Sequence, residues 1–241
     1  MGTTLSLQRP PGASRMTRHE VVQGLLALFE APRYLEIGVA KGVTFHAVRA
    51  AEKVAVDPRF GFDVAEAARA NPTARYFQVT SDHYFGRIVG TDERFDVIYL
   101  DGLHTAEQTL RDLLNALEFL KPDGIIVIDD VKPVTALAAI PDRATFARVR
   151  AYLGSREKAW MGDVYKVVWF IDTFLQQLSW RTVAENHGQA VVWRKRRGEV
   201  RPRTIQEVGL TSFEQFVADI DTLRIAPYAE IVAAVRTGRE G

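Results

Sequence analysis

Cysteine is absent from the 241 residues of this chain. Its absence excludes disulfides, thiolate zinc sites and a thiol nucleophile, so any metal must be held by oxygen or imidazole ligands. Net charge is also nearly absent, with 31 Lys and Arg against 30 Asp and Glu, which removes a general attraction to nucleic acid or anionic membranes. No run of about 18 apolar residues occurs, and the N-terminus has no apolar signal segment. We therefore expect a cytoplasmic protein that binds neither nucleic acid nor membrane.

The rest of the sequence indicates one domain with additions at both ends. Residues 1–15, rich in Gly, Pro, Ser and Thr, are expected to form a flexible leader. Thr17 and Glu20 form a capping box, which predicts that a helix begins there. We assign residues 16–195 to one α/β domain, and residues 196–241 to a basic linker and C-terminal helices packed on it. The basic run 194–203 contains no aromatic residue for stacking on bases, so we interpret it as a solvated linker.

Short apolar segments alternate with longer amphipathic segments from residue 34 to residue 130. This alternation predicts a doubly wound, mostly parallel sheet. Trp180–Ala184 and Gln189–Arg194 then predict an antiparallel hairpin at the end of the sheet. The expected fold is therefore α/β, with seven strands and extra N- and C-terminal helices. The parallel strands are expected at Tyr34–Val39, Lys53–Asp57, Arg75–Val79, Phe95–Asp101 and Ile125–Asp130.

A glycine turn follows the first strand, in the sequence Glu36-Ile-Gly38-Val-Ala40-Lys-Gly42. Gly38 permits a tight turn, and Gly42 permits close approach at the start of the next helix. Asp57 ends the following strand, where a carboxylate can reach a ribose diol. A dinucleotide site would require G-x-G-x-x-G and would place the Glu36 charge near a pyrophosphate. The turn instead suits a ligand that carries an ammonium group.

Carboxylates also end the two strands in the middle of the predicted sheet, Asp101 on one and Asp129 and Asp130 on the next. Neighbouring strands lie about 4.8 Å apart, and ligands bind beyond their carboxyl ends. Negative charges at this distance repel one another, so basic side chains or a bound cation must neutralise the carboxylates. Oxygen ligands favour Mg²⁺, with Mn²⁺ or Ca²⁺ as alternatives. A structural alternative is that one aspartate caps a helix and another pairs with Lys132.

His104 lies three residues after Asp101. An imidazole, whose pKa is near neutrality, can take a proton from a hydroxyl that a cation has acidified. The alternative for His104 is a helix cap. We assign no chemistry to His19, His46 and His187.

At the glycine turn the sequence resembles the class I S-adenosylmethionine-dependent methyltransferases, whose first motif is acid-x-Gly-x-Gly-x-Gly. Ala40 departs from this motif at the middle glycine. The resemblance implies that Glu36, Gly38 and Gly42 surround the methionyl part of S-adenosylmethionine and that Asp57 binds its ribose. Ser81 and Asp82, at the end of the third strand, match the place where the family contacts adenine. A helix N-cap is the alternative for Asp82.

The stretch Phe95–Val131 resembles the metal-dependent O-methyltransferase branch, which includes enzymes for antibiotic sugars, and the cephalosporin-hydroxylase-like proteins. The resemblance makes Asp101, Asp129 and Asp130 the metal ligands. Some relatives carry an acidic base at the place of Leu103, and others use a histidine three residues after the first ligand, so the resemblance implies that His104 is the catalytic base. The same branch often places a segment like Trp160–Lys166 near the acceptor.

The function implied is therefore a divalent-metal-dependent O-methyltransferase that uses S-adenosylmethionine. Its acceptor would be a hydroxyl of a small molecule, with a sugar or glycosylated natural product favoured by the resemblance. The alternatives are a catechol or phenol O-methyltransferase, an NAD-dependent oxidoreductase and a non-catalytic cofactor-binding protein. The sequence leaves homo-oligomerisation open.

Overall fold

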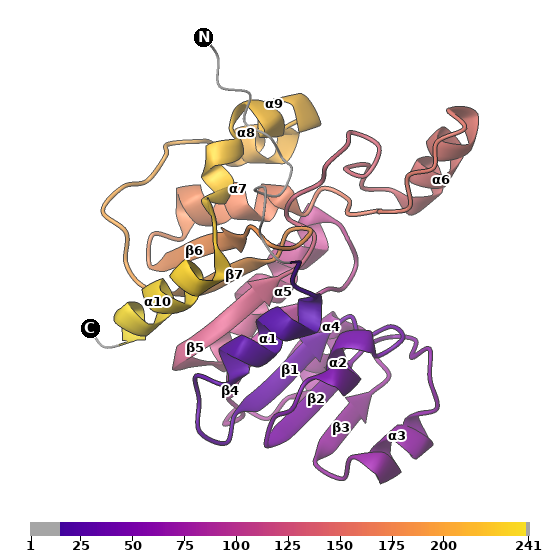
Figure 1. Ribbon diagram of the computed structural model, residues 1–241, viewed down its shortest axis with the longest axis vertical. Coiled ribbons are helices and arrows are strands. Elements are labelled where there is room, and N and C mark those ends of the chain that lie inside the picture. Colours follow the sequence, from indigo (N-terminus) through magenta and orange to yellow (C-terminus); the bar gives the residue numbers. More distant parts are fainter. Residues whose placement is uncertain (1–14, 240–241) are drawn as a thin grey trace.

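The structure, a computed structural model, describes residues 15–239 and contains one mixed sheet (Figure 1). Its strand order is β3-β2-β1-β4-β5-β7-β6-β8. The expected leader lies outside the described residues, apart from Arg15. The strands are β1 (Arg33–Ile37), β2 (Glu52–Val56), β3 (Ala74–Phe77), β4 (Phe95–Leu100), β5 (Leu120–Ile128), β6 (Leu178–Val183), β7 (Ala190–Arg194) and β8 (Ile225–Ala226).

The first five strands are parallel, and they form the half of the sheet that the sequence describes best. All six residues of β4 are buried, as expected of a strand covered on both faces. The chain runs outward from β1 to β2 and β3, and then returns to place β4 on the other side of β1. A crevice opens at such a reversal, beyond the carboxyl ends of β1 and β4.

Helices cover both faces of the sheet. In Figure 1, α1 (Arg18–Leu26) and α10 (Tyr228–Arg239) lie on one face, and α5 (Ala106–Phe119) and α7 (Tyr165–Phe174) on the other. Two separate apolar clusters form accordingly, one around α1 and α10 and one around α5 and α7. The other helices are α2 (Val43–Ala47), α3 (Val64–Ala70), α4 (Ser81–His83), the π-helix η1 (Tyr84–Ile88), α6 (Arg143–Tyr152), α8 (Ile205–Leu210), α9 (Phe213–Ala218) and the 3₁₀ helix η2 (Ile220–Leu223).

The antiparallel hairpin of β6 and β7 is present as predicted, with β7 paired to β5. The two-residue strand β8 adds to the predicted seven strands at the far edge. The Ala184 amide donates a 3.0 Å hydrogen bond to the carbonyl of Ala226, beyond the end of β6. So short a strand has no apolar periodicity that a sequence could reveal.

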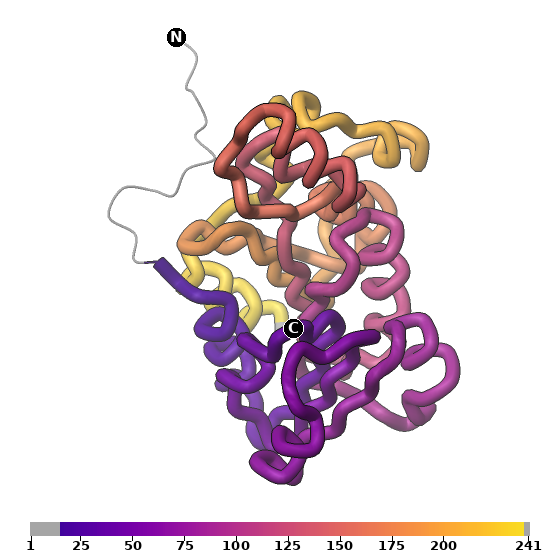
Figure 2. Tube along the Cα trace, turned by 90° about the vertical axis from the view of Figure 1, so that its right-hand side faces the viewer, coloured from indigo at the N-terminus to yellow at the C-terminus, as the bar shows by residue number. Residues whose placement is uncertain are grey.

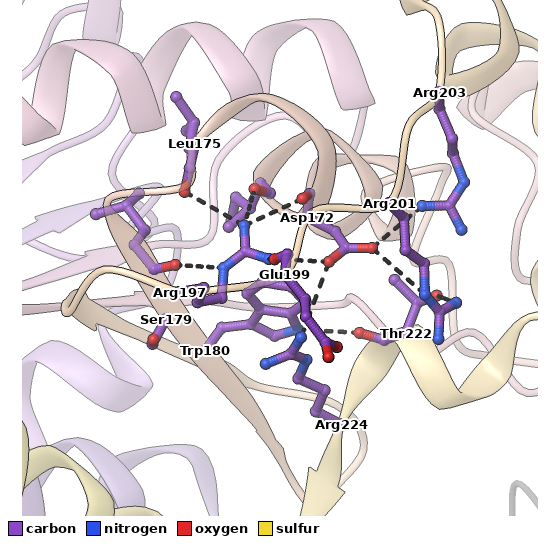
Figure 3. A network of polar contacts seen from close by, with 12 residues as sticks. Asp172, Leu175, Ser179, Trp180, Arg197, Glu199, Arg201, Arg203, Thr222 and Arg224 are labelled. Carbon is purple, nitrogen blue, oxygen red and sulfur yellow. Dashed lines mark hydrogen bonds and ion pairs between the residues drawn. The ribbon is translucent and has the colours of Figure 1, made fainter.

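The prediction that residues 194–203 form a solvated linker is wrong for Arg197 and Arg203 (Figure 3). Arg197 is only 7% exposed and donates to the Asp172 carboxylate at 3.1 Å, while its guanidinium lies 4.6 Å from the Trp180 ring centre. Arg203 donates to the other Asp172 oxygen at 3.2 Å. The basic composition of the segment is plain in the sequence, but its buried acidic partner on α7 is not.

In Figure 2 the segment between β5 and α7, which includes α6, gathers at the upper end of the molecule, and the segment from β1 to β3 lies towards the lower end. Among residues 15–239, no helix is both long enough and apolar enough to cross a membrane.

Candidate active site

A cavity of about 950 Å³ lies where the topology places the crevice. It is lined by residues that follow β1, β2, β3 and β4, and by residues of α1 and the segment before α7. The lining includes most of the side chains that the sequence singled out, which are Glu36, Gly38, Asp57, Ser81, Asp82, Asp101 and His104. Gly42, Asp129 and Asp130 are not part of the lining.

Gly38 has a structural reason to be glycine. Its φ is +87°, and a Cβ atom there would lie 2.0 Å from the carbonyl oxygen of Asp101. Ala40 takes a φ of +46°, which glycine adopts at lower cost. Its amide donates to Asp57 Oδ2 at 2.8 Å, so the turn also holds this carboxylate in place. Gly42, with a φ of +74°, makes room for the ring of His46 rather than for the cavity.

Glu36 lines the cavity and is only 2% exposed. Tyr34 donates its hydroxyl to Glu36 Oε2 at 2.6 Å. Burial raises the pKa of Glu36 to about 8, because ionisation is costly away from water. A cationic ligand in the cavity would favour the ionised carboxylate.

Ser81 and Asp82 occupy the first turn of α4, at the end of the cavity farthest along the sheet from β5. Gln108 of α5 joins them, because its amide donates to Ser81 Oγ at 3.2 Å and to Asp82 Oδ1 at 3.1 Å. The N-cap alternative for Asp82 is wrong, since Thr80 caps this helix through the amide of His83. The Asp82 side chain is therefore not used to cap the helix.

Asp129 and Asp130 follow β5 beneath the cavity wall, and they are 2% and 3% exposed. Asp130 has a φ of +59°, which is strained for a residue with a side chain. The Lys132 alternative is wrong: Lys132 donates to the carbonyl of Asn186 at 3.1 Å, whereas Arg18 contacts the Asp129 carboxylate.

Three carboxyl groups close together cannot all ionise at ordinary cost. Burial, together with the neighbouring Asp129 and Asp130, raises the pKa of Asp101 well above its usual range. Burial also opposes the ionisation of Asp129, but His187 and Arg18 outweigh it and lower its pKa.

The two aspartates after β5 retain unsatisfied oxygens. Asp129 Oδ1 and Asp130 Oδ2 are buried, and no described residue gives either of them a hydrogen bond of good geometry, although His187 Nε2 lies 2.8 Å from the first and His104 Nδ1 lies 2.9 Å from the second. The guanidinium of Arg18, itself a cation, lies against both carboxylates. Oxygen donors that already attract a cationic side chain fit a divalent cation.

His104 lines the cavity next to Asp101 and Asp130. Its Nδ1 lies 2.8 Å from the carbonyl oxygen of Trp160, and its ring stacks on the indole of Trp160 at 4.8 Å. Donation from Nδ1 to that carbonyl leaves the proton off Nε2, which lies 3.6 Å from Asp101 Oδ1. Burial lowers the pKa of His104, but the Asp130 carboxylate outweighs burial and raises it. A cation shared by Asp130 would weaken that effect.

Sequence reasoning missed Arg18 and His187. Arg18 was part of the predicted first helix, and nothing nearby in the sequence indicates that it reaches the end of β5. His187 could have been found: β7 pairs antiparallel with β5, and Ala190 lies opposite Ile128. The turn before Ala190 must therefore lie beside Asp129.

Comparisons with known proteins agree with this geometry. Residues 35–131 match the model of a protein family described as a methyltransferase domain. In fold, the chain is similar to the O-methyltransferase of Bacillus cereus in complex with SAH, at 15% identity over 76% of this chain and 82% of that chain, with a TM-score of 0.52. It is also similar to TomG from Streptomyces achromogenes, an O-methyltransferase of tomaymycin synthesis in complex with SAM, at 15% identity over 77% and 83%, with a TM-score of 0.51.

At such low identity these two likenesses establish the fold alone, and a search of the curated proteins found no match. The family match carries more, because it spans the glycine turn and every predicted site residue as far as Asp130. Residues 35–131 therefore match a methyltransferase domain, and the chain has the Rossmann-like methyltransferase fold that the sequence predicts.

Proposed function

We propose that this protein is an S-adenosylmethionine-dependent and divalent-metal-dependent O-methyltransferase that acts on a hydroxyl of a small molecule. One observation carries the proposal: a single cavity joins the glycine turn with Glu36 and Asp57 to the rim with Asp101 and His104. Cofactor and acceptor can then meet at one topological switch point without a second domain.

The proposed cofactor site follows the cavity from β1 to β3. Glu36 would pair with the ammonium of the methionyl group, and Asp57 would accept hydrogen bonds from the ribose hydroxyls. Ser81 and Asp82 would contact adenine, with Gln108 holding both side chains. The SAM and SAH complexes of the two structural neighbours support this choice of cofactor.

The proposed acceptor site lies at the rim. Asp101, Asp129 and Asp130 would hold the cation, and Mg²⁺ is the ion that the sequence favours. Such an ion acidifies a hydroxyl bound to it. His104 would then accept the hydroxyl proton at Nε2, while its Nδ1–H stays on the Trp160 carbonyl and fixes the ring.

A sugar or glycosylated natural product is the proposed acceptor. The role of TomG in the synthesis of tomaymycin supports a natural product, and the resemblance of Phe95–Val131 to enzymes for antibiotic sugars supports the sugar. A cytoplasmic location and homo-oligomerisation stay predictions from the sequence.

Methyl transfer to a panel of hydroxyl acceptors, followed by mass spectrometry, tests the proposal. We expect a gain of one methyl group on a sugar-bearing acceptor, its loss in EDTA, and its return on adding Mg²⁺ or Mn²⁺ in excess. Methyl transfer that EDTA leaves unchanged would remove the metal from the proposal. Transfer to nitrogen or carbon atoms alone would contradict O-methylation.

A further inference from the structure

We propose that His187 is a nitrogen ligand of the cation site and that the site therefore prefers a transition metal, such as Mn²⁺ or Co²⁺, over Mg²⁺. This inference rests on the proposed function, because it takes the carboxylate rim to hold a cation. It adds a ligand that the sequence did not suggest and changes the class of metal expected.

Asp129, Asp130 and His187 each place one donor atom within 4.8 Å of the others. His187 Nε2 lies 2.8 Å from Asp129 Oδ1 and 3.6 Å from Asp130 Oδ1. Neighbouring ligands of a six-coordinate ion with bonds of about 2.1 Å lie about 3 Å apart. His187 and Asp129 are thus already spaced as neighbouring ligands of one ion, and Asp130 lies close enough to join them after a small movement.

Arg18 Nε donates to both the Asp129 carboxylate and His187 Nε2, the latter at 3.1 Å. When Nε2 accepts in this way, its lone pair also faces the buried Asp129 Oδ1 at 2.8 Å. A metal ion between Nε2 and Oδ1 would accept an electron pair from each of these two atoms.

The guanidinium of Arg18 occupies the position that we propose for the metal ion. Its guanidinium contacts Asp129, lies 3.7 Å from Asp130 Oδ1 and touches His187, which are the three members of the donor set. The Arg18 side chain is 43% exposed and belongs to the first residue of α1, so it can swing into solvent without disturbing the core. We expect an incoming metal ion to displace it.

The turn of the hairpin, which carries His187, is held against the segment after β5. The amide of Val131 donates to the carbonyl of Gly188 at 3.0 Å, which ties the turn to the segment after β5. Gly188 has a φ of +132°, and a Cβ atom there would lie 2.5 Å from Cβ of Lys132. The turn therefore lies directly against the chain that carries the two aspartates.

An imidazole ligand changes which metal ion the site prefers. Carboxylates alone suit Mg²⁺ and Ca²⁺, whereas imidazole nitrogen binds later first-row metals much better. A second set of possible donors, formed by Asp101, His104 and Asp130, also contains an imidazole. We assign the nitrogen ligand to His187 because Arg18 lies against its donor set, and because the proposed reaction needs the Nε2 lone pair of His104 as the proton acceptor.

Pulsed electron paramagnetic resonance of the Mn²⁺-loaded full chain tests the inference. Electron spin echo modulation from a directly bound ¹⁴N is expected in the wild-type protein and in His83→Gln, a control on the surface of α4. It should be lost in His187→Gln and kept in His104→Gln. By calorimetry, Mn²⁺ should bind at least about tenfold more tightly than Mg²⁺, and His187→Gln should reduce this ratio. Arg18→Gln should tighten Mn²⁺ binding.

Other outcomes would overturn the inference. Mn²⁺ that binds without ¹⁴N modulation would contradict it and leave the proposed function intact. Modulation that survives in His187→Gln and is lost in His104→Gln would assign the nitrogen to the other donor set. If no divalent ion binds, the inference fails together with the metal role, while methyl transfer remains a separate readout. Circular dichroism checks that the variant is folded, and His187→Asn replaces it if it is not.

Discussion

The proposed pairing of Glu36 with the cofactor would make cofactor binding depend on pH. Its pKa is raised from 4.5 to about 8, so the free protein holds it protonated at neutral pH. A ligand that carries an ammonium group binds the ionised form, and binding therefore releases a proton. We predict that the affinity for S-adenosylhomocysteine rises by about tenfold per pH unit from pH 6 to pH 8 and then levels off. Calorimetry in buffers of different ionisation enthalpy measures both the affinity and the released proton.

Glu36→Gln is the matched variant for this test, because it keeps the size of the side chain and removes the titration. At pH 8 this variant should bind S-adenosylhomocysteine more weakly than the wild-type protein does. Its affinity should also lose the increase between pH 6 and pH 8 that the titration of Glu36 causes. An unchanged slope in Glu36→Gln would assign the proton to another group.

Gly38 tests the turn itself. We expect Gly38→Ala to lower the free energy of unfolding by about 2–4 kcal/mol, because a left-handed alanine and a clash with the Asp101 carbonyl add together. Urea unfolding measures this change. Gly86→Ala in η1 is the control, since nothing lies within 4 Å of its Cβ position, and it should leave the free energy of unfolding unchanged or raise it by up to about 1 kcal/mol. Equal effects of the two substitutions would contradict the turn geometry.

His104 tests the base. His104→Gln should lower kcat by about 10²–10⁴-fold, because proton removal from the acceptor would lose its general base. The affinity for S-adenosylhomocysteine should stay unchanged, since His104 lies at the rim and not at the glycine turn. His83→Gln should keep the wild-type kcat. Wild-type turnover in His104→Gln would refute the assignment.

At the scale of elements, the buried ion pair between α7 and the segment after β7 sets the stability of the C-terminal part (Figure 3). Removing the Asp172 carboxylate leaves the Arg197 guanidinium buried without its counterion. Asp172→Ala should therefore lower the free energy of unfolding by about 3–5 kcal/mol, measured by urea unfolding. Arg196→Ala, which removes only an exposed contact to Gln176, should cost less than about 0.5 kcal/mol. A loss below 1 kcal/mol in Asp172→Ala would show that the pair is not important for stability.

The parallel strands could be predicted from the sequence because each is an apolar segment of ordinary length, and β4 is the plainest case. The strand β8 and the burial of Arg197 could not. Both depend on contacts between segments distant in the chain, and the sequence of each segment taken alone indicates exposed, irregular structure. The role of Asp172 could not be predicted either, because it depends on ion pairs with Arg197 and Arg203, which lie in another segment of the chain.

The site could be predicted in part, for the same reason. Glu36, Gly38 and Asp57 come together because parallel strands end at one edge, which the order of segments already implies. Arg18 and His187 arrive from α1 and the hairpin, so their place depends on packing that no local pattern reveals. The sequence accordingly placed carboxylates at the rim but not the groups that contact them.

For the whole molecule, the topology brings the proposed cofactor residues and the proposed acceptor residues around one cavity. The reversal between β1 and β4 opens a cavity at the carboxyl ends of the strands, and the hairpin closes the sheet beside β5. The proposed cofactor residues lie on the side of β1 to β3, and the three aspartates of the proposed cation site lie on the side of β4 and β5. Methyl donor and acceptor would therefore occupy neighbouring parts of one cavity.

Calorimetric titration of the full chain with S-adenosylhomocysteine and with NAD distinguishes a methyltransferase cofactor site from a dinucleotide site in this cavity. We predict that S-adenosylhomocysteine binds and that Asp57→Ala weakens its binding. We predict that NAD does not bind, because the Glu36 carboxylate would repel a pyrophosphate and because Ala40 replaces a glycine of the dinucleotide-binding turn. Binding of NAD without binding of S-adenosylhomocysteine would contradict the account.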